Sequence, residues 1–515
     1  MPTVNYVNRA RELFAQYGPA EAIVAHDRRL TYHDLETSVR TMAAALHEHG
    51  IRSGMGVAVL AFNPPEAVFL QLGLHLLGCR SVWIAPNAPG RFQVEYLRMA
   101  EVDAFIYDAR SLADLGQELA QTAPHLAVFS LGPGGAGPDL AAAPTAASLP
   151  IDPATVTHEP ESVFQTGGTT GRPKLVHHGH AFFDALHTFA EFYRDTDGRE
   201  IRHLAVSGFW HASSQTAGLI TLFTGGTLFL QEGLVMEDFF ATIERERITS
   251  TLVSPPILYL LMDNPLLEKT DVSSLNILSV GGAAAAPTRM AQALERFGPG
   301  VRPSYGMSEA TFITAYNDFR HDPEHPERLG SCGLAYGDTI IEIRDDAGSV
   351  LGPGEIGEVW VSTALKMSGY WGDPDLTRET LVDGWLKSGD VGYLDADGYL
   401  YLVDRSKDMI VTGYSSTNVY SRPVEDALCS HPDVRAAAVI GVPDERTGEA
   451  VHAYVVAAPG SDPSTTELRS HVVAELNELW APREIEFVDD LPLTEMGKVD
   501  KKALRARYLA ARTPS

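Results

Sequence analysis

Short apolar runs alternate with amphipathic stretches along the first part of the chain. The run VAVLAF at 57–62 predicts a buried strand. The segment NPPEAVFLQLGLHLLG follows it and predicts a helix, because Asn63 can cap a helix, prolines suit a first turn and Gly78 suits a helix end. The apolar runs SVWIAP, DAFIYDA, STLVS and LNILSV continue this alternation. The rhythm predicts parallel sheets in an α/β architecture.

The pattern changes from about Glu355. The runs GEVWVST, GYLYLVDR and MIVTG alternate apolar and polar positions between Gly and Asp turns, which is typical of antiparallel strands. A helical run, two further strands and a second helix follow, and Ser464 and Glu467 have the spacing of a capping box before that helix. We therefore predict a multidomain α/β protein. Its expected parts are a large N-terminal domain of α/β layers with mainly parallel sheets and a small β-rich subdomain over 1–404, a mobile α+β C-terminal domain over 405–515, and a hinge at 404–407.

Composition narrows the classes of partner. The 515 residues carry a net charge of −27, which argues against a nucleic-acid or anionic-membrane binder but leaves room for one small anion in a local positive pocket. Cys79, Cys332 and Cys429 are too widely separated for a zinc or disulfide framework, so reduced thiols are expected. There is no signal-peptide pattern, and the apolar windows fall short of the roughly 18–20 residues that span a bilayer. We expect a cytoplasmic protein with no membrane insertion.

The stretch QTGGTTGRPKLVHHGH at 165–180 holds candidate chemistry. Glycines let backbone N–H groups converge on an anion, threonine hydroxyls add donors and Lys174 adds a positive charge, so these are the parts of a phosphate cradle. No Gly-Lys-Ser/Thr closes the loop as a Walker A motif would. Taken alone, such a loop is more often a structural turn. The adjacent His177, His178 and His180 lack a cysteine or carboxylate cluster, which favours a solvated helix start over a metal site.

Four later segments strengthen the interpretation of that loop as a phosphate-binding loop. SYGMSEA at 304–310 combines an aromatic ring, a hydroxyl and Glu309, and KSGDVG presents Asp390 on a glycine turn that suits a ribose diol. DRSKD at 404–408 places two cations at the domain joint, and MGKVDKKAL places Lys498 beside a glycine. Each also has a plain structural interpretation, as a turn carboxylate or a surface lysine. Together and in this order they are far more specific than any one of them.

In this order the motifs resemble the adenylate-forming enzymes, which include acyl-CoA synthetases, adenylation domains of nonribosomal peptide synthetases and luciferases. The resemblance runs nearly end to end and is carried by TGGTTGRPK, SVGGAAAAP, SYGMSEA, GEIGEVWV, KSGDVGYLDADGYLYLVDRSKDMI and MGKVDKKAL. It implies a C-terminal domain that rotates at Lys407. It also implies a two-step reaction: a carboxylate attacks the α-phosphate of ATP with Mg2+, giving an acyl-adenylate and pyrophosphate, and a thiol then takes the acyl group.

The resemblance also implies roles for individual residues. The catalytic set is Thr166, Lys174, Glu309 and Lys498, with Glu309 as the Mg2+ ligand and Lys498 bridging the carboxylate and the α-phosphate. Tyr305 would lie against adenine, and Asp390 with Arg405 would bind the ribose. The remaining ATP-binding positions are Gly167, Gly168, Thr169, Thr170, Gly171, Gly282, Ala283, Gly306, Met307 and Ser308. The acid pocket would be formed by Trp210, His211, Gly281, Gly282 and Tyr305.

Three departures from the family pattern, together with one run of alanines, bear on the substrates. Gly167 stands where the family usually has a serine or threonine, which removes one hydroxyl from the phosphate loop. Trp210 and His211 occupy the region where amino-acid-activating members carry an aspartate, which favours a plain carboxylic acid. The alanines at 283–286 leave room for an aryl or medium-length acyl group. The segment after Gly413 carries an apparent two-residue insertion where the family lines its pantetheine tunnel, so the acceptor stays open.

The function that these observations favour is a carboxylic acid–CoA ligase that uses ATP, Mg2+ and CoA. One alternative keeps adenylation but transfers the acyl group to a carrier-protein phosphopantetheine or to a nitrogen nucleophile, as amide-forming and diazotising members do. A catalytically inactive nucleotide-binding protein is the other alternative. The expected partner is a small-molecule carboxylic acid, with an acyl or peptidyl carrier protein as the alternative acceptor, and both a monomer and a homodimer stay open.

Overall fold

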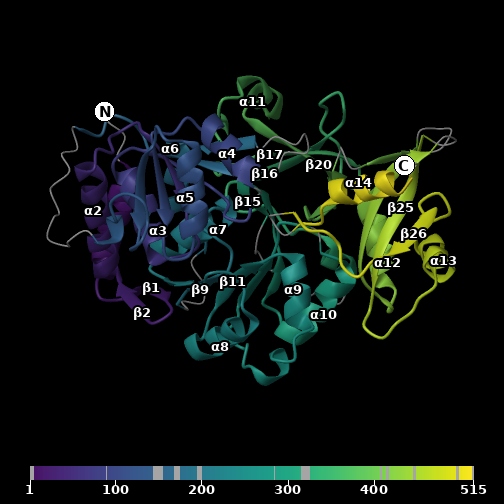
Figure 1. Ribbon diagram of the computed structural model, residues 1–515. Helices are drawn as coiled ribbons and strands as arrows, with labels where there is room; N and C mark the ends of the chain where they lie inside the picture. Colours follow the sequence, from purple (N-terminus) through teal and green to yellow (C-terminus); the bar gives the residue numbers. More distant parts are fainter. Residues whose placement is uncertain are drawn as a thin grey trace.

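The computed structural model describes residues 5–88, 90–142, 155–166, 174–193, 200–283, 285–314, 325–405, 409–412, 417–444, 448–494 and 498–512. Two large sheets and a β-rich subdomain form one body, and a smaller C-terminal domain lies against it (Figure 1). Within these ranges no helix is both long and apolar enough to cross a bilayer. Short 3-10 turns occur at Leu140–Ala142, Leu267–Lys269 and Pro326–Gly330.

The first sheet has seven strands in the order β13-β12-β11-β9-β10-β1-β2, parallel except for the β1–β2 hairpin. Helices follow its strands, as the alternating sequence pattern predicts. Its strands are β1 (Glu21–Ala25), β2 (Arg28–Thr31), β9 (Arg202–Ala205), β10 (Thr227–Leu230), β11 (Ser250–Val253), β12 (Ile277–Val280) and β13 (Val301–Pro303). The helices are α7 (Ala212–Phe223), α8 (Met236–Glu246), α9 (Pro255–Met262) and α10 (Pro287–Phe297).

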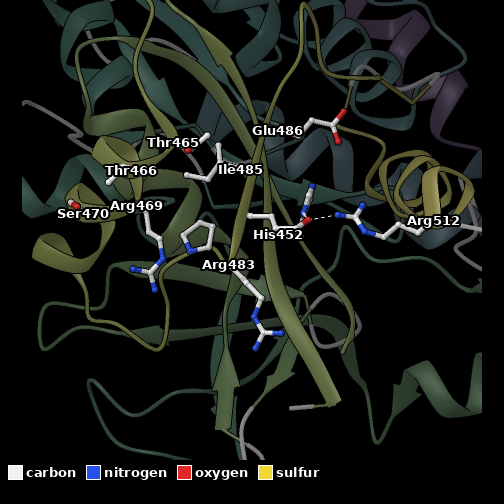
Figure 2. Close-up of a pocket in the computed structure, with 11 residues that line it drawn as sticks. His452, Thr465, Thr466, Arg469, Ser470, Arg483, Ile485, Glu486 and Arg512 are labelled. Carbon is white, nitrogen blue, oxygen red and sulfur yellow. Dashed lines mark hydrogen bonds and ion pairs between the residues drawn. The ribbon is translucent and has the colours of Figure 1, made fainter. Parts of the chain in front are cut away.

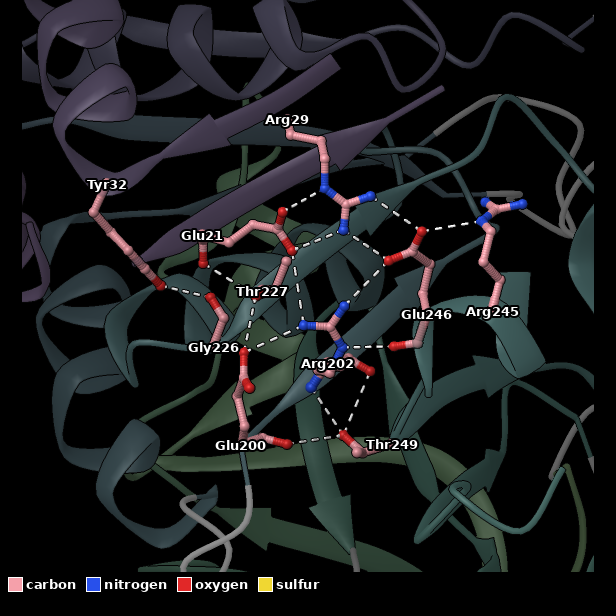
Figure 3. A network of polar contacts seen from close by, with 10 residues as sticks. All are labelled: Glu21, Arg29, Tyr32, Glu200, Arg202, Gly226, Thr227, Arg245, Glu246 and Thr249. Carbon is pink, nitrogen blue, oxygen red and sulfur yellow. Dashed lines mark hydrogen bonds and ion pairs between the residues drawn. The ribbon is translucent and has the colours of Figure 1, made fainter. Parts of the chain in front are cut away.

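A polar network ties the β1–β2 hairpin to this sheet (Figure 3). Arg29 on β2 donates to Glu21 at 2.7 Å and to Glu246 at the end of α8 at 2.8 Å. Arg202 on β9 also contacts Glu246, at 3.3 Å. Arg245 also contacts Glu246, at 3.0 Å, so three arginines balance the charge of this buried carboxylate.

The second sheet has the order β18-β8-β7-β4-β3-β5-β6, parallel from β7 to β6 and antiparallel at β8 and β18. Its strands are β3 (Gly56–Leu60), β4 (Arg80–Trp83), β5 (Ala104–Asp108), β6 (Ala127–Leu131), β7 (Glu161–Thr166), β8 (Lys174–His178) and β18 (Gly369–Tyr370). The neighbouring helices are α1 (Tyr6–Tyr17), α2 (Tyr32–Glu48), α3 (Pro65–Leu76), α4 (Gly90–Met99), α5 (Ala113–Thr122) and α6 (His180–Tyr193).

Helix α3 lies between the two sheets. All of its residues are buried, and one apolar core joins Val57 and Val59 of the second sheet to Ile23 and Leu228 of the first. This explains why its sequence is mostly apolar, with Glu66, Gln71 and His75 as buried polar exceptions. The prediction that Asn63 caps this helix is wrong. Pro64 occupies the N-cap position, and no side chain makes a capping hydrogen bond there.

The β-rich subdomain is antiparallel, which confirms the change of pattern after Glu355. It contains the hairpin β14 (Tyr305–Met307) and β15 (Ala310–Thr314), the strands β16 (Ile340–Arg344), β17 (Gly357–Ser362), β19 (Leu381–Val382), β20 (Trp385–Leu394) and β21 (Leu400–Arg405), and helix α11 (Pro374–Thr380). Strand β21 pairs with β20, so the chain leaves this subdomain at Arg405.

The C-terminal domain is a five-stranded sheet with three helices. It consists of β22 (Ile410–Thr412), β23 (Thr417–Val419), α12 (Ser421–Ser430), β24 (Val434–Asp444), β25 (Gly448–Ala457), α13 (Thr465–Glu475), β26 (Glu484–Phe487) and α14 (Lys501–Arg512). Ser464 caps α13 by accepting from the Glu467 N–H, as its spacing predicts. The predicted hinge residue Lys407 lies outside the described residues, so the boundary at 404–407 stays a prediction. The mixed fold itself confirms the predicted α/β class.

Candidate functional site

The parallel strands of the first sheet end at one edge, and the predicted pocket residues follow them there. Gly281 comes after β12 and Ser304 after β13, and these strands are neighbours in register. A Cβ atom on Gly281 would lie 2.3 Å from the Ser304 hydroxyl oxygen, so a glycine is needed for this approach. Gly282 has φ +83°, which also favours glycine. The carboxyl edge of a parallel sheet is where α/β proteins bind ligands.

Tyr305 and Asp390 meet although they are far apart in the sequence. The Tyr305 hydroxyl donates to Asp390 Oδ2 at 2.6 Å, and both side chains are buried. Burial and the negative charge of Asp390 raise the pKa of Tyr305, so its hydroxyl stays protonated. Asp390 on β20 pairs with Arg405 on β21 across the sheet. The backbone therefore brings together the three positions expected at adenine and ribose.

Met307, Ser308 and Glu309 lie at the turn of the β14–β15 hairpin. A Cβ atom on Gly306 would lie 2.9 Å from the Phe312 backbone nitrogen, which explains the glycine there. The Glu309 carboxylate is 6% exposed, and its Oε1 accepts from the Tyr370 hydroxyl at 2.8 Å. A buried carboxylate with one oxygen fixed in this way offers the hard oxygen donor that a magnesium ion prefers.

His178 supports the same turn from behind. Its Nε2 atom donates to the Ser308 carbonyl at 2.7 Å, and burial lowers the pKa of this imidazole to about 3, so it is neutral. The prediction of a solvated helix start is wrong in part. His177 and His178 belong to β8, whereas His180 does begin α6, and both His178 and His180 are buried. Leu175 and the β-branched Val176 before the histidines were the signal of a strand that the sequence interpretation missed.

The two ends of the predicted phosphate loop face each other across a β hairpin. Thr166 on β7 pairs with Lys174 on β8. The Lys174 amine lies 5.1 Å from the centre of the Tyr370 ring, whose hydroxyl binds Glu309. The structure thus brings Lys174 and Glu309 to one place. The loop positions Gly167, Gly168, Thr169, Thr170 and Gly171 lie outside the described residues.

The turn at 207–211 follows β9 and carries Trp210 and His211. Buried Asn63 holds this turn: its side-chain amide donates to the Ser207 carbonyl at 3.1 Å and to the Gln231 carbonyl at 2.9 Å, and its oxygen accepts from the Phe209 N–H at 3.0 Å. The Trp210 ring lies edge-on to Phe62, with centres 5.6 Å apart. Asn63, which follows a strand of the second sheet, therefore acts as a clamp that positions a turn of the first sheet.

Lys498 lies in the C-terminal domain, between β26 and α14. The Thr494 N–H donates to the Lys498 carbonyl at 2.6 Å, which closes a small loop before α14. In Figure 1 the yellow segment that precedes α14 runs back toward the large domain. Burial, and to a lesser degree the positive charge of Lys498, lower the pKa of His211 to about 4, so this imidazole is neutral.

Contacts between the domains hold this orientation. Arg422 at the start of α12 donates to the Leu402 carbonyl at 2.9 Å and to the Gly330 carbonyl at 3.4 Å. The adjacent Ser421 N–H donates to the Asp404 carboxylate. These bonds join the C-terminal domain to the β-rich subdomain just beside the predicted hinge.

A cavity of about 600 Å³ lies elsewhere, between α13, β25 and β26 (Figure 2). Its three arginines each form an ion pair with a carboxylate: Arg469 with Glu478, Arg483 with Asp444 and Arg512 with Glu484. A group of metal-ligand type, His431, Asp433 and Glu467, also lies in this domain. None of these side chains belongs to the predicted site.

The chain matches known proteins over nearly its full length. Residues 10–371 match the AMP-binding enzyme family, and 423–498 match the AMP-binding enzyme C-terminal domain. A medium/long-chain fatty-acid–CoA ligase of Mycobacterium tuberculosis is 34% identical, over 94% of this chain and 86% of that protein. A feruloyl-CoA synthase of Amycolatopsis is 34% identical over 96% and 97%. The solved amide bond synthetase McbA of Marinactinospora thermotolerans is similar with a TM-score of 0.88 and 37% identity, over 98% and 100%.

Proposed function

Since this chain belongs to the AMP-binding enzyme family, we propose that it activates a carboxylic acid with ATP and transfers the acyl group to CoA. It is an ATP-dependent, AMP-forming ligase, and the resemblance predicted from its motifs is confirmed. Curated relatives that are 34% identical act as acid–CoA ligases, which supports CoA as the acceptor. The observation that supports the catalytic site most is the buried hydrogen bond from Tyr305 to Asp390, because it joins two motifs that are far apart in the sequence at the expected nucleotide site.

In the first half-reaction, one carboxylate oxygen of the acid attacks the α-phosphorus of ATP. A new O–P bond forms, the bond from the α-phosphorus to the bridging oxygen breaks, and pyrophosphate leaves with its electrons. Lys498 would bridge the attacking carboxylate and the α-phosphate, where its charge stabilises the negative charge of the transition state. This step needs no proton transfer, so orientation and charge account for the catalysis.

The nucleotide would be held by residues from three sheets. Thr166 and Lys174 would bind the β- and γ-phosphates together with the loop at 167–171. The Tyr305 ring would lie against adenine, Asp390 would accept from the ribose hydroxyls and Arg405 would donate to them. Gly282, Ala283 and the segment 306–308 would line the same nucleotide site. Glu309 would hold Mg2+, which neutralises phosphate charge when it is bound.

In the second half-reaction, the CoA thiolate attacks the carbonyl carbon of the acyl-adenylate. A C–S bond forms, the C–O bond to phosphate breaks, AMP leaves and the thiol proton passes to solvent. We propose that the C-terminal domain rotates about Lys407 between the two steps. The hydrogen bonds from Arg422 and Ser421 to the β-rich subdomain would break in that rotation, and Lys498 would withdraw.

The acid is a plain carboxylic acid without an α-amino group. The segment SGFWHAS has no acidic residue to bind an ammonium, and His211, whose pKa is lowered to about 4, is neutral at pH 7. An ammonium beside Lys498 would also meet like charge. The apolar ring of Trp210 favours an apolar fatty or aryl body in the same pocket.

Transfer to a nitrogen nucleophile is the second candidate, and one observation favours it. The amide bond synthetase McbA shares 37% identity with this chain, which exceeds the 34% of the CoA ligases named above. The altered segment after Gly413 lies where the resemblance implies the pantetheine tunnel. Its central residues are outside the described part of the chain, so the choice depends on a product assay.

The test is ATP–pyrophosphate exchange with a panel of fatty acids from six to sixteen carbons and of aryl acids, on the full-length protein. We expect exchange with at least one acid and none with an α-amino acid. The active acid is then incubated with ATP and either CoA or an amine, and the product is identified by mass spectrometry. A thioester supports CoA ligation, and an amide formed in its place supports the second candidate. Absence of exchange with every acid at high protein concentration contradicts both.

A further inference from the structure

Tyr370 connects two groups that the motifs do not connect. It lies on β18, opposite Val176 of β8, and backbone hydrogen bonds from the neighbouring Ser368 and Trp371 to β8 fix it there, each at 2.8 Å. Residues two apart on a strand share a face, so Tyr370 lies on the same side of the sheet as Lys174. The Lys174 amine accordingly lies 5.1 Å from the centre of the Tyr370 ring.

The hydroxyl of the same side chain holds Glu309. It donates to Glu309 Oε1 at 2.8 Å, and both side chains are buried, at 7% and 6% exposure. A second tie runs through the backbone, because the Met367 N–H donates to the Glu309 carbonyl at 2.7 Å. One rigid aromatic side chain therefore fixes a carboxylate at its hydroxyl end and borders an amine at its ring.

We propose that Tyr370 is a positioning residue that sets the placement of Glu309 relative to Lys174. This inference rests on the proposed function, in which Glu309 holds the metal ion and Lys174 the terminal phosphates. With Oε1 bound by the phenol, the carboxylate keeps one rotamer, and Oε2 would be the oxygen that binds the metal. The metal ion and the phosphates that it contacts must lie at a fixed distance from each other. Tyr370 sets this distance because it fixes Glu309 relative to Lys174. Partners of metal ligands typically contribute about 10- to 100-fold in metal affinity.

The test measures metal binding without turnover. The full-length protein is titrated with Mn2+ in the presence of α,β-methylene-ATP, and free Mn2+ is followed by electron paramagnetic resonance. We expect Tyr370→Phe to weaken Mn2+ binding about 10-fold, because this change removes the hydroxyl and keeps the ring. AMP binding without metal should be unchanged in the same variant. In pyrophosphate exchange, the Mg2+ concentration for half-maximal rate should rise by a similar factor while the KM for the acid stays constant.

Two further variants separate positioning from general stabilisation. Tyr401→Phe is the matched control, because the Tyr401 hydroxyl also donates to a carboxylate, Asp395, at 3.4 Å outside the site. It should leave Mn2+ binding unchanged. In a Glu309→Gln background, Tyr370→Phe should weaken Mn2+ binding less than twofold further, since its partner is already altered.

The outcomes distinguish the inference from the proposed function. Unchanged Mn2+ binding in Tyr370→Phe overturns the inference, with or without a lower melting temperature. An equal loss in the Glu309→Gln background also overturns it, because Tyr370 would then act through another group. Failure of the unmodified protein to bind both AMP and the Mn2+ complex of the ATP analogue would contradict the proposed function itself.

Discussion

The clamp formed by Asn63 gives a prediction that joins stability to substrate binding. The side chain is 2% exposed and makes three hydrogen bonds, to the carbonyls of Ser207 and Gln231 and from the N–H of Phe209. Asn63→Leu has a similar shape but leaves the buried Phe209 N–H and two partly buried carbonyls without their partner. At about 1–3 kcal/mol for the buried group and less for each carbonyl, and with some compensation from the apolar side chain, we expect a loss of about 2–4 kcal/mol.

The same change should act on the acid more than on ATP, because the clamp holds the turn that carries Trp210 and His211. Urea unfolding measures the stability, and pyrophosphate exchange measures KM for each substrate. We expect the KM for the acid to rise about tenfold, equivalent to about 1.4 kcal/mol, with the KM for ATP changed less. Asn477→Leu is the control, because Asn477 also accepts backbone N–H groups but is exposed. A loss below about 1 kcal/mol together with an unchanged KM for the acid would refute this reasoning.

Two further predictions concern ionised groups. Hydrogen bonding to Arg29 lowers the pKa of Glu246 from 4.5 to about 2, so the contribution of this carboxylate to stability is present above pH 4.5 and is lost as the pH falls toward 2. Glu246→Gln should therefore lower the free energy of unfolding by about 2–3 kcal/mol at pH 7. A difference between variant and unmodified protein in urea unfolding that does not shrink between pH 4.5 and pH 3 would contradict this. Tyr305→Phe removes a buried hydrogen bond to Asp390. In pyrophosphate exchange it should raise the KM for ATP about fivefold and leave the KM for the acid unchanged. An unchanged KM for ATP would count against a role of Tyr305 and Asp390 in nucleotide binding.

The fold class and most elements could be predicted because local pattern and environment agree in them. The run VAVLAF forms β3, and the apolar segment after it forms the fully buried helix α3. The antiparallel strands after Glu355 alternate visibly because one face of each is more exposed. The spacing of Ser464 and Glu467 identified the start of α13 correctly.

The parts that sequence reasoning missed depend on contacts between distant segments. Asn63 has the position and chemistry of a helix cap, yet its side chain bonds to Ser207, Phe209 and Gln231 because a sheet edge lies beside it. His178 reads as part of a polar run, but its strand pairs on both sides, and its ring reaches Ser308. Tyr370 has no local signal at all, since its importance comes from Glu309 on another hairpin.

The central claim is that Lys498 serves adenylation from the orientation described here, and Lys498→Ala tests it most directly. Both half-reactions are measured on this variant: pyrophosphate exchange with the active acid, and thioester formation from the preformed acyl-adenylate and CoA. We expect exchange to fall by about 10²–10³-fold or more, as for other groups that stabilise a transition-state charge, and thioester formation to persist. Retained exchange would contradict the claim, and so would the equal loss of both half-reactions.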